Sequence, residues 1–151
     1  MKQLTTLIIA LEEKVPMLEI ENLQISKAKV GWHIQHSLMV VNNIINVLKK
    51  ADPKAYKWSF NLNRVLVFSM GKIPRGKGKA PKTVLPQDNI TSALLYEHIE
   101  KAKMNASFLP QLHKNQHFKH PYFGPLNLKP TIKFLVMHTK HHLEIIEDIL
   151  K

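Results

Sequence analysis

The chain has 151 residues, of which 44% are hydrophobic and 22% charged. This is the size and composition of one globular domain, and we expect residues 1–151 to fold as a single domain. It contains no cysteine, which excludes disulfides, thiolate metal sites and a nucleophilic thiol of its own. The formal net charge is +11, and the segment from Lys49 to Lys82 holds ten basic residues against one acid, Asp52. Such an excess raises the question of an anionic partner.

The N-terminal stretch Leu4–Leu11 predicts a short amphipathic helix. It runs directly into Glu12 and Glu13 without a small-residue cleavage site, so it does not resemble a signal peptide. No stretch approaches the roughly 20 apolar residues that a membrane span requires. We therefore expect a cytoplasmic protein with no membrane partner.

A long helix is expected from a cap at Ser26 to about Lys50, because Pro53 follows closely. Apolar residues surround most of this helix, which predicts that it is largely buried. Its polar residues form a narrow strip, namely Gln35, Asn42, Asn46 and Lys49.

Residues 51–86 predict a long irregular connection. The apolar run Val65–Met70 is too short for periodicity to distinguish a helix from an extended segment. The stretch PRGKGKAPK is a loop by composition. It is either a solvated loop or an anion-binding one, in which Arg75, Lys77 and Lys79 would contact a carboxylate or phosphate. No nucleic-acid-binding signature accompanies the basic residues, so nucleic acid is not the expected partner.

Two further helices are expected. The first has Asp88 or Thr91 as its cap and extends to about Pro110, and the last begins near Lys129–Pro130 and reaches the C-terminus. The polar connection HKNQHFKHPYFGPLN between them shows no strand pattern, and its histidines, His113, His117 and His120, are expected to be solvated. The predicted fold is all-α, a four-helix bundle with a long irregular connection between helices 2 and 3.

The last helix contains the sequence HTKHH. At about 100° per residue, His138 and His142 fall within its apolar stripe, whereas His141 lies at the margin. Two buried imidazoles cost free energy unless their nitrogens find partners. The partner is either a shared divalent metal ion or backbone and water hydrogen bonds. A third ligand would come from a facing helix, and helical phase alone does not decide between His33 and His36; His98 is a further candidate that we expect to be exposed.

The stretches GWHIQHSLMV and HPYFGPLNLKPTIKFLVMHTKHH resemble the DinB/YfiT-like superfamily of metalloenzymes, in particular its uncharacterised branch with an H-P-x-F-G segment before the last helix. The resemblance covers about residues 26–151. It implies a four-helix bundle in which His36, His138 and His142 hold a divalent metal ion, and it implies a homodimer, since members often form dimers. Nitrogen ligation suits Zn or Ni, as well as Cu or Fe.

Characterised members of that superfamily transfer low-molecular-weight thiols or act as metal-dependent isomerases or hydrolases. This chain departs from many of them at Glu144 and Ile145, where Arg or Gln types are common, and in its short first helix. The expected function is a metal-dependent transferase or hydrolase acting on a thiol or an anionic small molecule. His33 and His141 flank the ligands and either support them through hydrogen bonds or proton transfer or are surface groups. The alternatives are a metal-binding bundle without catalysis and a binding module for an anionic partner.

Overall fold

The computed structural model describes residues 2–76, 82–86 and 89–151. In this part of the chain, helices dominate, as the expected all-α class requires. The elements are α1 (Lys2–Glu12), α2 (Val30–Lys50), α3 (Leu62–Met70), α4 (Ser92–Phe108), β1 (His117–His120), β2 (Gly124–Asn127) and α5 (Leu128–Ile149). The expectation that the chain has no strands is therefore wrong.

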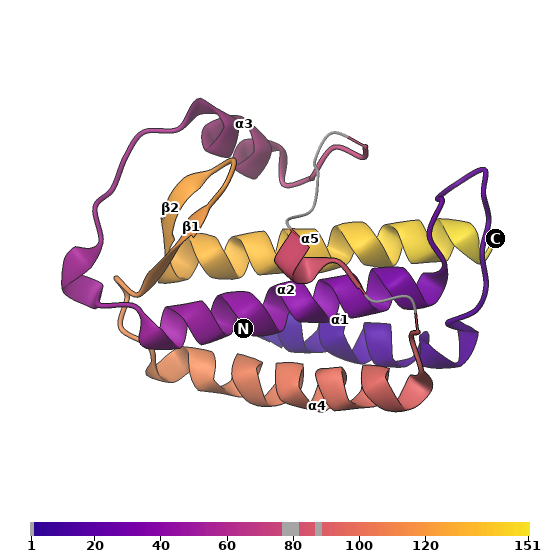
Figure 1. Cartoon of the computed structure of the whole chain (residues 1–151). Coiled ribbons are helices and arrows are strands. Elements are labelled where there is room, and N and C mark those ends of the chain that lie inside the picture. Colours follow the sequence, from indigo (N-terminus) through magenta and orange to yellow (C-terminus); the bar gives the residue numbers. More distant parts are fainter. Residues whose placement is uncertain (1, 77–81, 87–88) are drawn as a thin grey trace.

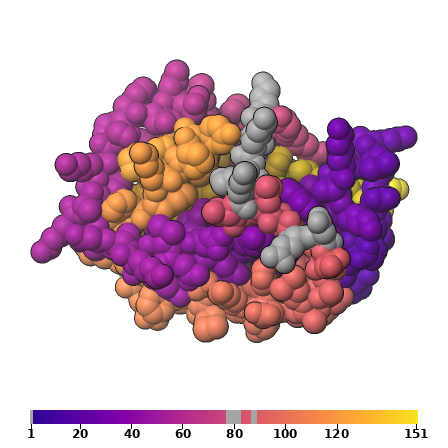
Figure 2. Space-filling model, viewed as in Figure 1, coloured from indigo at the N-terminus to yellow at the C-terminus, as the bar shows by residue number. Residues whose placement is uncertain are grey.

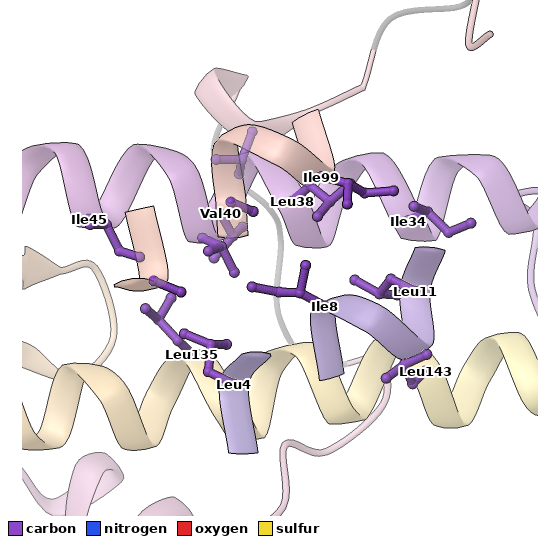
Figure 3. Packing of buried hydrophobic residues seen from close by; sticks show 14 of the residues in the cluster. Leu4, Ile8, Leu11, Ile34, Leu38, Val40, Ile45, Ile99, Leu135 and Leu143 are labelled. Atoms are coloured by element: carbon purple, nitrogen blue, oxygen red, sulfur yellow. The ribbon is translucent and has the colours of Figure 1, made fainter. Parts of the chain in front are cut away.

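The helices α1, α2, α4 and α5 run side by side (Figure 1). Both α1 and α2 contact α4 and α5. The core lies between them, and Figure 3 shows aliphatic side chains from all four helices meeting there. The contribution of α1 is Leu4, Ile8 and Leu11, which are fully buried and share one face because they recur at helical spacing. The predicted short N-terminal helix is thus confirmed.

Helix α2 differs from its prediction at its start. Ser26 is not its cap: the helix begins at Val30, and the cap position is Lys29, which makes no side-chain capping bond. The helix is largely buried, as expected, and the burial includes Gln35 and Asn42 of the polar strip, while Val47 is 49% exposed. Periodicity located the helix correctly but could not show that its polar side faces another helix.

Asn42 is buried because it is hydrogen-bonded across to α4. Its side-chain amide donates to the carbonyl of His98 at 3.1 Å and its Oδ1 accepts from Asn105 at 2.8 Å. The Asn105 oxygen accepts in turn from the Lys49 ammonium at 2.6 Å. A buried amide with its hydrogen bonds satisfied avoids most of the cost of losing water, so this polar network replaces apolar packing between α2 and α4.

The connection after α2, predicted to be irregular, contains a short helix. The ambiguous apolar run is a helix, α3, because Asn61 caps it by accepting from the backbone N–H of Arg64 at 2.8 Å. Gly71 ends it in the left-handed conformation, with φ of 65°. None of the α3 residues is fully buried. The connection returns to α2 through a 3₁₀ turn at Lys82–Val84.

The strands β1 and β2 form an antiparallel hairpin in the register His117↔Asn127 to His120↔Gly124. The stretch HPYFG is its turn. Nδ1 of His120 accepts from the backbone N–H groups of Tyr122 at 3.1 Å and Phe123 at 3.2 Å, and Gly124 has φ of 68°. One side chain and one glycine therefore close the turn.

His120 is not the solvated histidine that the sequence suggested. Its ring stacks on Phe123 with centroids 4.3 Å apart and meets the edge of Phe134 at 4.6 Å. Burial lowers the pKa of His120 to about 4. The hairpin thus carries an aromatic cluster onto the first half of α5. Of the other two connection histidines, His113 is exposed and His117 half-buried.

The remaining helix ends agree closely with the sequence. Thr91 caps α4 by accepting from the N–H of Leu94 at 3.2 Å, while Asp88 lies outside the described residues. Helix α4 ends at Phe108 and α5 begins at Leu128. No helix in the described ranges is both long and apolar enough to cross a membrane.

Candidate metal centre

Two helices bring three histidines together. His36 comes from α2, while His138 and His142 lie one turn apart on α5, which packs against α2. Each offers one ring nitrogen, and these three nitrogens lie within 4.8 Å of one another. The ring centroids are 4.7–5.1 Å apart. Ligand nitrogens about 2.0–2.1 Å from a tetrahedral ion are about 3.4 Å apart, so small ring movements would close the group around a divalent metal ion.

His36 is held in one orientation. Its Nδ1 lies 2.7 Å from the carbonyl oxygen of Val84, and because a carbonyl only accepts, Nδ1 must carry the proton. The other nitrogen, Nε2, is then unprotonated and free to bind a metal ion. Trp32, one turn earlier on α2, stacks on this ring at 5.0 Å with an interplanar angle of 15°. The arrangement of a ligand histidine oriented through its second nitrogen is typical of metal sites.

His138 supplies the clearest sign that the group fits an ion. Its side chain as a whole is half-buried, but its Nδ1 is enclosed and has no hydrogen-bond partner among the residues that the structure describes. A buried nitrogen without a partner costs free energy. Coordination to a metal ion is one way to satisfy such a nitrogen, and the donor set of three imidazoles suits borderline ions such as zinc or nickel.

His142 is oriented by His33, one of the two residues expected to flank the ligands. The two Nδ1 atoms lie 3.1 Å apart, and Nε2 of His33 lies 3.0 Å from the hydroxyl oxygen of Ser26. When Nε2 of His142 is unprotonated, its Nδ1 carries the proton and donates to His33. His33 then donates from Nε2 to Ser26, which also accepts from the N–H of Ala28 at 3.1 Å. The chain of bonds is thus compatible with the His142 tautomer that a metal ion requires.

Burial keeps the centre uncharged. It lowers the pKa values of His36, His138 and His142, and in the last two the neighbouring histidines lower the pKa further. Burial also lowers the pKa of His33 to about 4. Neutral imidazole is the form that binds metal ions, so at neutral pH protons compete little for these nitrogens.

His141 lies beside the centre and outside the ligand group. Its ring meets His142 edge-on at 5.2 Å, and burial lowers its pKa, with Arg75 as the next cause. His141 lines a hollow of about 290 Å³ together with Lys72, Arg75 and Lys140, as well as Glu144. Three basic side chains therefore approach this flank of the centre.

The basic loop is described only in part. Arg75, expected to bind an anion, pairs with Asp148 near the end of α5 at 2.8 Å. Lys77 and Lys79, predicted with it, lie outside the described residues. His98, the remaining ligand candidate, is half-buried on α4 rather than exposed and is not part of the histidine group.

Two partners of the centre were missed by sequence reasoning. The carbonyl of Val84 lies 48 positions from His36, and a backbone oxygen leaves no trace in residue types. Ser26 was interpreted as a helix cap, the usual reason for a serine before a helix. Its actual contact with His33 would have been visible only with the loop conformation known.

Comparison of the chain with protein-family models, with curated proteins and with solved structures gave no match.

Proposed function

We propose that this chain is a DinB-like four-helix bundle, a single domain that binds one divalent metal ion, zinc or nickel, through His36, His138 and His142. The observation that carries the proposal is the convergence of three uncharged imidazoles whose nitrogens lie within 4.8 Å of one another. The hydrogen bonds of His36 and His142 support it, because both engage Nδ1 and not Nε2. The packing of α1, α2, α4 and α5 supports the bundle.

We further propose that the ion serves a transferase reaction of a low-molecular-weight thiol or a hydrolysis. A divalent ion with neutral ligands supplies a Lewis acid that lowers the pKa of a water or thiol. The residues of the chain position it: Val84 orients His36, His33 orients His142, and Trp32 covers the His36 ring. The chain has no cysteine, so a reacting thiol must come from the substrate.

The substrate class follows from charge. The hollow beside His141 is lined by Lys72, Arg75, Lys140 and one carboxylate, Glu144. Because Arg75 pairs with Asp148 and Lys140 with Glu144, Lys72 supplies the excess positive charge. A thiol or ester that carries a carboxylate or phosphate would be attracted there. We propose such an anionic substrate, and a homodimer in the cytoplasm as the working form.

The test compares metal-loaded and chelator-stripped protein in thiol-transfer assays with anionic and neutral thiols and in ester hydrolysis assays. The proposal predicts turnover only with metal, faster with anionic substrates, and lost in His142→Ala. Turnover that is unchanged in the stripped protein would contradict the metal-dependent reaction.

A metal-binding role without catalysis is the second candidate. One observation favours it: the side chains that lower the pKa values of His138 and His142 are other histidines, and no carboxylate of the described residues shifts either pKa. Metal-loaded protein that remains inactive across both assay types would select this role.

A further inference from the structure

Helix α3 presents apolar side chains to the outside. Leu62, Val65, Leu66 and Met70 are all exposed, and their spacing of three and four residues places them on one face of the helix. The opposite side, with Val67 and Phe68, packs toward the core. In Figure 1, α3 lies above α5, and Figure 2 shows the same segment at the upper edge of the molecule.

Two exposed aromatic residues lie just before this stripe in the sequence, and Trp58 lines a hollow together with Val65. Trp58 and Phe60 precede α3, and each is 68% exposed. We call the six side chains the α3 surface: Trp58, Phe60, Leu62, Val65, Leu66 and Met70. Single exposed apolar residues are ordinary, whereas a row of large ones along one helix face marks an interaction surface.

The surroundings of the α3 surface are basic. Lys54, Lys57 and Lys72 are exposed on either side of it in the sequence. A hollow of about 440 Å³ adjoins Trp58 and Val65, and its lining includes Arg64 and Lys133 and no acidic residue among those described. The partner should therefore be anionic. Two copies of the chain that met through this surface would bring like charges together, which opposes association.

We propose that the α3 surface docks onto a bilayer that contains anionic phospholipids. Such a bilayer offers an apolar layer for the stripe and a negative surface for the lysines. Tryptophan and phenylalanine beside lysine are typical of side chains at the headgroup boundary. In the hollow, Arg64 donates to the backbone carbonyls of Ser59, Phe123 and Pro125, so a phosphate headgroup there would meet chiefly the ammonium of Lys133. This contact is peripheral and needs no spanning helix.

The test is co-sedimentation of the full chain with vesicles of phosphatidylcholine alone or mixed with phosphatidylglycerol. The proposal predicts binding to the mixed vesicles, little to phosphatidylcholine, and weaker binding as salt rises. In a Trp32→Phe protein, the emission of Trp58 should shift to shorter wavelength on binding, because its ring leaves water.

A matched pair of variants measures how much the apolar side chains of α3 contribute to vesicle binding. Leu66→Glu should weaken binding by about tenfold or more, the loss expected for one inserted leucine. Met104→Glu makes the same charge change at another exposed apolar residue, on α4, and should bind almost as the unaltered protein does. Both positions are exposed, and circular dichroism would verify the fold of each variant.

Three results would overturn the proposal. The first is no binding to the mixed vesicles at low salt. The second is equal weakening by Leu66→Glu and Met104→Glu, which would leave only a charge effect. The third is a lipid-free dimer, seen by light scattering, that Leu66→Glu converts to a monomer, because the α3 surface would then bind a second copy.

Discussion

The direct contact between His33 and His142 gives His33 a function that can be measured. When Nε2 of His142 binds a metal ion, Nδ1 of His142 carries the proton and His33 is its acceptor. Replacing His33→Ala removes this acceptor, and loss of such an orienting group typically weakens metal binding by about 10–100-fold. Calorimetric titration of the stripped protein with zinc would measure the change.

His141→Ala is the control for this prediction. His141 also touches His142, but edge-on at 5.2 Å, and no hydrogen bond joins the two rings in the described structure. Its removal should therefore weaken zinc binding far less. Equal losses in the two variants would show that ring packing, rather than the hydrogen bond, orients His142.

His120 predicts a pH dependence of stability. Its pKa is about 4 in the folded protein and about 6.5 in an unfolded chain. Between these values the unfolded state binds more protons, so this residue lowers the free energy of unfolding as pH falls from 6.5 toward 4. His120→Asn keeps an acceptor for the turn and cannot titrate. Urea unfolding at pH 7 and 4.5 should show a smaller loss of stability in this variant than in the unaltered protein.

One outcome of this comparison would contradict the prediction. The ligand histidines also have lowered pKa values, so both proteins should lose stability in acid. An identical loss in both would mean that His120 is protonated as readily when folded as when unfolded.

At the residue scale the sequence predicted the convergence of His138 and His142, because helical phase depends only on spacing. The choice of His36 as the third ligand required the family resemblance, because helical phase alone does not decide between His33 and His36. In the structure, the rings of His33 and His36 both contact the ring of His142 on α5. The carbonyl of Val84 could not have been predicted, because its position depends on how a connection folds back.

At the scale of elements, the network between α2 and α4 supports a stability prediction. Asn42→Ala removes one buried and one partly buried hydrogen bond and leaves Asn105 without one partner. We expect a loss of about 1–3 kcal/mol in the free energy of unfolding. Asn43→Ala, at the next position, removes a bond to the carbonyl of Thr83 from an exposed residue and should cost about 0.5 kcal/mol or less. Urea denaturation would measure both, and equal costs would contradict the buried network.

Element prediction succeeded where a strong period or cap was present and failed where the signal was short. Thr91 marked the start of α4 correctly. The hairpin was missed because each strand has four residues, too few for alternation to appear, and because Pro121 and Pro125 suggested a loop. Its formation depends on His120 and on packing against α5, which are tertiary contacts.

At the scale of the whole molecule, metal binding should stabilise the fold. The centre joins α2 to α5, so an ion bound only by the folded chain shifts the unfolding equilibrium. At a free zinc concentration 100 times the dissociation constant, the expected gain is about 2.7 kcal/mol. Thermal unfolding with zinc and with chelator should show this difference, and His138→Ala should show almost none. A shift of equal size in that variant would place the ion elsewhere.

The net positive charge could be read from the composition, but the surfaces on which the basic residues lie could be identified only from the structure. The sequence located the basic residues between Lys49 and Lys82. Only the structure shows that the same segment exposes the α3 surface, because a helical period does not tell which face turns outward. The basic residues of this segment thus lie near two features, the hollow beside His141 and the α3 surface.

The most direct measurement of the central claim is the metal content per chain of the purified protein and of three single variants, His36→Ala, His138→Ala and His142→Ala, with exposed His113→Ala as the control. The account predicts about one divalent ion in the unaltered protein and in the control, and almost none in the three variants. Full metal content in His138→Ala would contradict it.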